Sequence, residues 1–219
     1  MLGETLDEDR GRIPLRFQIP DEFQEIALEE PPEERARRTF EAFREQLKLT
    51  ERQAFHLAFS QEHMVARLRD EGAVYVGQCV ARSETDPTAL TSAQYTILVK
   101  KAELDAEDPL DAVAGGLRTP GEPREVLFAE FPAGKALVVG EELAVTSPFG
   151  PLGDPRPTTH RVRQAQVVLP FPDRRRLAII GVSSENLADW PSYVEILDGI
   201  VRSVSFTEPS AKSIAGVLG

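Results

Sequence analysis

Two stretches in the first third of the chain repeat apolar residues at helical spacing. The first starts after Pro31 and Pro32, and its apolar residues are Ala36, Phe40, Phe43 and Leu47. Charged residues of both signs occupy most of the positions between them. Apolar residues three to four positions apart share one face of a helix, so this stretch predicts an amphipathic helix with a solvated outer face.

The second helical stretch begins at Thr50, and Gln53 follows at the spacing of a capping box, in which the two side chains bind backbone N–H groups at the helix start. We expect this helix to run to about Glu71 and to end at Gly72. The residues expected to supply its apolar contacts are Phe55, Leu57, Phe59, Val65 and Leu68.

After Gly72 the apolar period shortens to two, which predicts strands. The predicted strands span residues 73–83, 93–104, 125–131, 136–147, 160–171 and 175–184. A weaker alternation occupies residues 23–28, and a short helix is expected after Asp108. The strands are joined mostly by short turns rich in Pro, Gly and Asp, which favours antiparallel pairing.

The last predicted element is a helix over residues 187–204. Asp189 stands at the position of a cap, and Pro191 is tolerated in a first turn. Its apolar stripe is wide and includes Trp190, Tyr193, Leu197, Ile200 and Val201. A stripe of this width is typical of a helix that covers a sheet, so we expect residues 174–206 to form a packing unit of strand, turn and helix.

These elements predict the α+β class: an antiparallel sheet of about six strands covered by helices, with two extra helices near the N-terminus. We expect residues 1–11 to be a flexible acidic tail, residues 12–207 to form a single domain, and residues 208–219 to be a flexible C-terminal tail.

The C-terminal half, about residues 124–206, resembles the Mog1/PsbP-like group. The stretches that carry the resemblance are "EFPAGKALVV", "QAQVVLPFPDRRRLAIIGVSSENLADW" and "YVEILDGIVRSVSF". The chain is also similar to uncharacterised actinobacterial proteins. The resemblance implies an α/β/α sandwich and a role in binding other proteins, as a chaperone or adaptor. It implies no particular binding residues, and a function inferred from a fold alone is analogy.

The amino-acid composition and net charge indicate which kinds of molecule the protein is suited to bind. Apolar residues make up 41% of the chain, enough to fill a core, and the formal net charge is −11. Nucleic acids and anionic membranes attract clustered Lys and Arg, so we expect neither as a partner. The sequence also lacks an apolar run of membrane-spanning length and an apolar signal segment, so we expect no membrane insertion and a cytoplasmic location.

Residues with catalytic or metal-binding chemistry form no complete motif. His56, His63 and His160 lack the spacing of a zinc site, and Cys79 lies in an apolar segment that predicts burial. Ser183 lacks the second glycine of a nucleophile elbow. We therefore predict no catalytic residue, metal or cofactor, although an enzyme whose site is assembled from dispersed residues remains an alternative.

Two short segments stand out as candidates for partner binding. Arg174, Arg175 and Arg176 form a basic cluster at a predicted turn. The tail "SIAGVLG", with Ile214, Val217 and Leu218, is apolar and terminal, and is similar to the short C-terminal peptides that load cargo into encapsulin shells. The leading hypothesis is a protein-binding module whose partner is another protein. The alternative is a component or cargo of a larger assembly, addressed by this tail.

Overall fold

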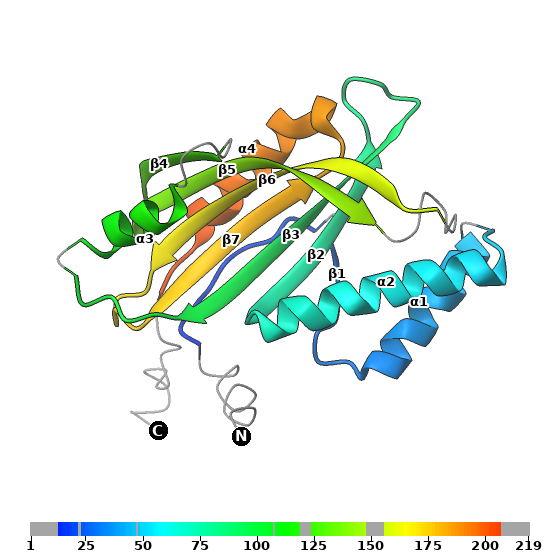
Figure 1. The fold of residues 1–219 in the computed structure, drawn as a ribbon, viewed down its shortest axis with the longest axis horizontal. Coiled ribbons are helices and arrows are strands. Elements are labelled where there is room, and N and C mark those ends of the chain that lie inside the picture. Colours follow the sequence, from blue (N-terminus) through cyan, green and yellow to red (C-terminus); the bar gives the residue numbers. More distant parts are fainter. Residues whose placement is uncertain are drawn as a thin grey trace, which may run out of the picture.

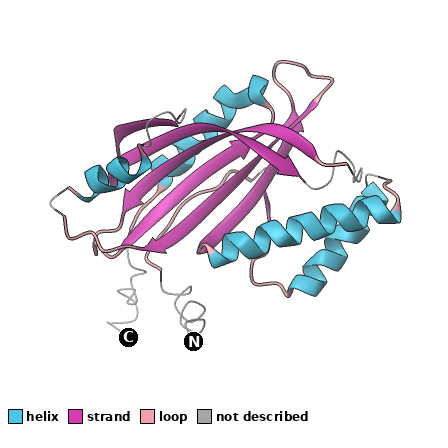
Figure 2. Cartoon of the chain, in the orientation of Figure 1, coloured by secondary structure: helices cyan, strands magenta, loops and turns pink. Residues whose placement is uncertain are grey.

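The computed structural model describes residues 13–21, 23–46, 48–106, 108–118, 124–147 and 156–206. These residues form a seven-stranded antiparallel sheet with helices on both faces (Figures 1 and 2). The strands are β1 (Gln24–Glu25), β2 (Ala73–Arg82), β3 (Leu90–Lys101), β4 (Arg124–Phe131), β5 (Gly134–Ser147), β6 (Thr158–Pro170) and β7 (Arg176–Ser184). The helices are α1 (Pro32–Gln46), α2 (Glu51–Asp70), α3 (Pro109–Leu117) and α4 (Trp190–Ser203), with a 3₁₀ turn at Leu187–Asp189.

The order of the strands places the last strand of the chain near the middle of the sheet. The order is β1-β2-β3-β7-β6-β5-β4, so β7 pairs with β3 on one side and β6 on the other. Its residues Leu177, Ala178, Ile180 and Val182 are buried. A strand that is covered on both faces reads as a nearly continuous apolar run, which explains the "LAIIGV" stretch.

Helix α4 covers one face of the sheet. Its buried residues Tyr193, Leu197 and Ile200 pack with Tyr95 and Ile180 from the central strands. Helices α2 and α3 lie on the opposite face: Val65 of α2 packs in a cluster with buried residues of β2 and β3, and α3 packs on β5 and β6. The sheet therefore lies between two helical layers.

The predicted α+β class and the antiparallel sheet are confirmed, but the expected number of strands was low. The seventh strand is the two-residue β1, which pairs with β2 through Gln24 opposite Gln78 and Glu25 opposite Gly77. Such a short edge strand is defined by its neighbour rather than by its own alternation, which is why the pattern at residues 23–28 was weak.

The predicted capping box is confirmed, and the predicted cap of the last helix is wrong. The Thr50 side chain accepts from the Gln53 N–H at 3.4 Å, and the Gln53 side-chain oxygen accepts from the Thr50 N–H at 3.0 Å. Asp189 precedes α4 but makes no side-chain cap hydrogen bond. Its carboxylate is instead bound by Ser83 and Glu84 at the end of β2.

Candidate functional site

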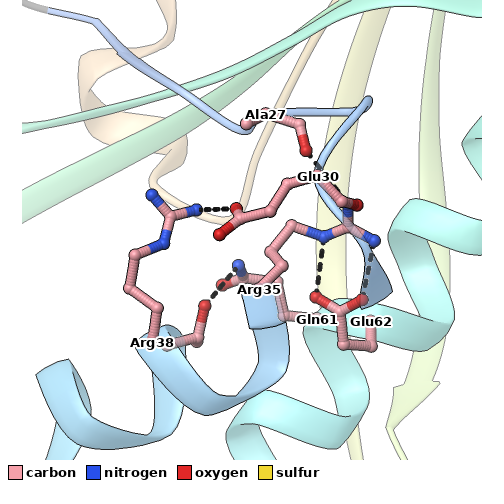
Figure 3. A network of polar contacts seen from close by, with 7 residues as sticks. Ala27, Glu30, Arg35, Arg38, Gln61 and Glu62 are labelled. Atoms are coloured by element: carbon pink, nitrogen blue, oxygen red, sulfur yellow. Dashed lines mark hydrogen bonds and ion pairs between the residues drawn. The ribbon is translucent and has the colours of Figure 1, made fainter. Parts of the chain in front are cut away.

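Helices α1 and α2 form a hairpin beside the β1–β2 edge of the sheet (Figure 1). Arg35 of α1 fixes this hairpin and is 1% exposed. Its Nε and Nη2 donate to the two carboxylate oxygens of Glu62 on α2, at 2.9 and 2.7 Å. Its Nη1 donates to the backbone carbonyls of Ala27 and Glu30, at 2.9 and 2.8 Å (Figure 3). One side chain therefore joins α1, α2 and the segment that leads from β1.

Two further polar contacts join the same three segments, α1, α2 and the residues that follow β1. Arg38 donates to a carboxylate oxygen of Glu30 at 2.5 Å, and Gln61 donates to the hydroxyl of Thr39 at 3.2 Å (Figure 3). A two-pronged Arg–carboxylate contact sets the relative orientation of the groups it joins. The network thus holds α1 and α2 in a defined relation.

The two helices enclose a groove of about 440 Å³. Its lining residues are Pro32, Glu33, Ala36, Arg37, Phe40, Phe55, Ala58, Phe59 and Glu62. Six of these nine side chains are apolar, and charged groups are confined to Glu33, Arg37 and Glu62. Grooves with this character commonly take up apolar side chains of a ligand or partner.

Phe55 and Phe59 are the exposed aromatic side chains of this groove. They are 59% and 60% exposed, and their rings stack with centroids 6.4 Å apart. Both were expected to supply apolar contacts of this helix; they do stack on each other, but more than half of each side chain is exposed. The face of α2 that packs on the protein carries Ala54, Ala58 and Val65, while Phe55 and Phe59 form a second apolar stripe one position further on.

The charge of the hairpin differs from that of the whole chain. Residues 31–71 contain eight acidic and eight basic side chains, so the hairpin is neutral, whereas the whole chain carries a formal charge of −11. The rest of the chain therefore holds the entire acidic excess. The groove is therefore built from a segment of zero net charge within an acidic chain.

The predicted arginine cluster lies at the turn between β6 and β7, where two of its members are bound by the chain itself. Arg174 adopts φ of 57° and donates through Nε to the carbonyl of Leu104 at 3.0 Å and through Nη2 to that of Ala106. Arg176 donates to Asp173 at 2.9 and 2.6 Å. The Arg175 side chain is exposed. Arg174 and Arg176 therefore stabilise the turn, and the three arginines do not form a set of cations that are all available to a partner.

The environment of this turn is electrostatically mixed. A hollow of about 930 Å³ beside it is lined by Lys101 and the three arginines but also by Glu103, Asp105 and Asp173. Burial opposes ionisation of Asp173, but the Arg175 N–H and the Arg176 guanidinium hold the pKa of its carboxyl below the usual value. With carboxylates among the cations, the turn lacks the concentrated positive charge that phosphate binding needs.

The other predicted candidates lie apart from the groove or outside the described residues. Ile214, Val217 and Leu218 lie outside the described residues. Cys79 is buried, as its apolar surroundings predicted. His160, on β6, has its Nδ1 3.4 Å from a carboxylate oxygen of Glu185, whereas His56 and His63 are on α2.

The described ranges contain no group of three or more His, Cys, Asp or Glu side chains placed to hold a metal ion. They also contain no helix that is both long and apolar enough to cross a membrane. No protein-family model, curated protein or solved structure matches the chain.

Proposed function

We propose that this protein is an adaptor that binds another protein by holding an amphipathic helix of that partner in the α1–α2 groove. The observation that carries this proposal is the stacked pair Phe55 and Phe59, which is more than half exposed at the mouth of an apolar groove. Large aromatic side chains dominate the binding energy at protein interfaces.

The shape and chemistry of the groove favour a helix over a small polar molecule. Two helices form its walls, and a third helix can lie along such walls with side chains at i, i+3, i+4 and i+7 pointing inward. Small polar ligands need several polar groups that converge on them. Here one of the three charged lining residues, Glu62, is already bound by Arg35.

Charge indicates the kind of helix. The chain outside residues 31–71 carries all of the net charge of −11, and an acidic chain attracts a basic partner and repels an acidic one. The proposed partner helix therefore has an apolar stripe flanked by Lys or Arg. The resemblance to the Mog1/PsbP-like group agrees with a role in protein binding.

Selection of helical peptides tests the proposal directly. A displayed library of helix-forming peptides is selected against the native chain, and the affinity of enriched peptides is measured for the native chain and for a Phe55→Ala/Phe59→Ala variant. We expect peptides with an apolar stripe and basic flanks. Loss of two such aromatic anchors costs at least ~2 kcal/mol at an interface, which weakens affinity more than about tenfold.

A matched control uses Val80→Ala/Leu90→Ala. These residues are 62% and 67% exposed on β2 and β3 and are not among the residues that line the groove, so this variant removes exposed apolar surface without changing the groove lining. We expect it to bind the peptides like the native chain. Failure to enrich any peptide, or equal affinity for the native chain and the groove variant, would overturn the proposal.

A further inference from the structure

The strand at the far edge of the sheet, β4, has one side without a strand partner among the described residues. It pairs with β5 over its whole length, from Arg124 opposite Glu141 to Phe131 opposite Gly134, and the register has no shift. On the other side, the Val126 carbonyl accepts a long contact of 3.5 Å from Nη2 of Arg118, at the end of α3. This carbonyl therefore points away from β5, toward the free edge.

The free edge is apolar on both faces of the sheet. Leu127 is 53% exposed on one face and Phe128 is 38% exposed on the other. Proteins usually protect a free edge with Pro, with inward-pointing charge or with a bulge. β4, with the sequence REVLFAEF, has neither Pro nor a bulge, and its charged residues Arg124, Glu125 and Glu130 flank an apolar centre. The end of α3 contacts only the start of β4, through Arg118 and Leu117, in the part of the chain that the structure describes. The centre of such an edge is suited to receive another strand.

The sequence of β4 is complementary to itself in the antiparallel direction. The backbone N–H and C=O groups of successive residues point to alternate sides of a strand. Those of Arg124, Phe128 and Glu130 therefore point to the free edge, as those of Val126 do. If two copies pair with Leu127 opposite Leu127, then Val126 lies opposite Phe128. In the same register Arg124 lies opposite Glu130, once at each end of the pairing.

We propose that two copies of the chain associate through β4 in this register, as a dimer with two-fold symmetry and one continuous sheet. A two-fold interface must match itself, and this one pairs apolar residues at its centre and opposite charges at both ends. Arg124 contacts Glu141 within the chain at 2.8 Å and donates through Nη1 to the Leu117 carbonyl at 3.1 Å, and Glu130 of the second copy adds a second carboxylate opposite that guanidinium.

A hollow of about 390 Å³ lies beside the edge. Leu127, Val138, Trp190 and Val194 supply apolar surface to its lining, and Glu125, Glu142 and Arg163 are among its charged lining residues. Val194 is 38% exposed on α4. A second copy of β4 would cover the open side of this hollow and remove Leu127 from water. The α1–α2 hairpin lies beside the β1–β2 edge, opposite to β4 (Figure 1), so pairing through β4 does not use the residues that line the groove.

Analytical ultracentrifugation of the full chain over a range of concentrations tests the association, and cysteine cross-linking tests the register. In a non-hydrogen-bonded antiparallel pair the facing Cα atoms are only ~4.5 Å apart. Leu127→Cys should therefore form a disulfide-linked dimer on mild oxidation. The matched control Ala129→Cys, two residues along the same face, would lie opposite Glu125 and should not. The native Cys79 is buried and does not compete.

Charge reversal supplies an independent test. Glu130→Arg places two arginines opposite each other at both ends and should raise the dissociation constant roughly tenfold or more, as should Arg124→Glu. An equimolar mixture of the two variants restores opposite charges at both ends, so it should dimerise again. Because Arg124→Glu also faces Glu141, its fold is checked by circular dichroism, and Leu127→Lys serves as a second disrupting variant.

A chain that sediments as a monomer at its highest soluble concentration would overturn the proposal. A dimer that survives Leu127→Lys, or that cross-links equally through residues 127 and 129, would overturn it as well. The Phe55→Ala/Phe59→Ala variant should dimerise like the native chain, so the outcome is independent of the proposed groove function.

Discussion

The carboxylate of Asp189 accepts a hydrogen bond from the hydroxyl of Ser83 at 2.9 Å, although the two residues lie 106 positions apart in the chain. The same oxygen accepts from the Glu84 N–H at 3.0 Å. Both Asp189 and Ser83 are buried. This contact ties the end of β2 to the start of α4, and thereby fixes the loop between β2 and β3 to the helix that covers the sheet.

The Asp189 contact predicts a pH-dependent contribution to stability. Burial would raise the pKa of this carboxyl, but hydrogen bonds from Thr91, Ser83 and the Glu84 N–H outweigh it and hold the pKa below its usual value. A folded-state pKa below the unfolded value stabilises the fold above the unfolded pKa of about 3.9, and this stabilisation is lost as the pH falls through the folded value. Asp189→Asn should therefore destabilise at pH 7, and by less at pH 3.

Urea unfolding of the native chain and Asp189→Asn at both pH values measures the effect. Asp198→Asn is the control, because Asp198 lies in an exposed ion pair with Arg202 whose contribution should be small. An equal loss of stability at pH 7 and pH 3 would show that the charge of Asp189 does not matter to the contact.

Asp189 also shows where local sequence patterns stop being informative. Its position before an apolar helix and its residue type both favour a cap, and the helix does begin at the next residue. The choice between capping and binding Ser83 depends on a loop more than a hundred residues away. Helix and strand positions followed from period and turn chemistry, since those are local properties, whereas side-chain partners across the sheet are not.

The groove between α1 and α2 is a second feature that local sequence patterns predict only in part. The spacing on α2 correctly predicted a helix, but this helix has two apolar stripes, and only the one with Ala54 and Val65 faces the protein. The sequence does contain a signal: Ala54, Phe55, Ala58 and Phe59 together exceed what one face can bury. That signal predicts an exposed stripe without indicating which residues form it.

The Arg35 network predicts a large loss of stability when the guanidinium is removed. Arg35→Ala leaves the partly buried Glu62 carboxylate and the carbonyls of Ala27 and Glu30 without their donor. Breaking a buried ion pair by removing one member costs ~3–5 kcal/mol. We expect a loss in this range in the free energy of unfolding, measured by urea denaturation.

Arg38→Ala is the matched control for Arg35. Arg38 lies on the same helix and pairs with Glu30, but its side chain is 59% exposed. Exposed ion pairs contribute ~0.2–1 kcal/mol, so the loss should be much smaller. Similar losses for the two variants would mean that Arg35 does not hold the hairpin together.

The position of Gly77 has no room for even a methyl group, so we expect substitution there to destabilise the fold. A Cβ atom built on Gly77 would lie 2.2 Å from the hydroxyl oxygen and 2.8 Å from Cζ of Tyr75, whose ring lies over the glycine. Tyr75 is buried and packs edge-on against Phe17, so the ring has little freedom to move. Overpacking of this kind costs ~1–3 kcal/mol, and Gly77→Ala should lower the thermal midpoint accordingly.

The control for Gly77 is Gly199→Ala on α4, where a Cβ atom would meet nothing within 4 Å. Alanine is favoured over glycine within a helix by ~0.5–1 kcal/mol, so this variant should be neutral or stabilising. If Gly77→Ala behaves like Gly199→Ala, the ring of Tyr75 does not occupy the space above Gly77.

The burial of Trp190 leads us to expect that this side chain anchors α4 to the sheet. It is the first residue of the helix, is 8% exposed and belongs to the main core cluster, and the Arg163 guanidinium lies 5.3 Å from its ring centroid. Trp190→Ala should cost ~3–5 kcal/mol, because it removes a large buried ring and leaves a cavity. Val194→Ala, one turn further along α4 at a 38% exposed position, should cost less than ~1 kcal/mol. Urea denaturation of both variants separates the two cases: a loss below ~1 kcal/mol for Trp190→Ala would mean that this ring does not anchor the helix.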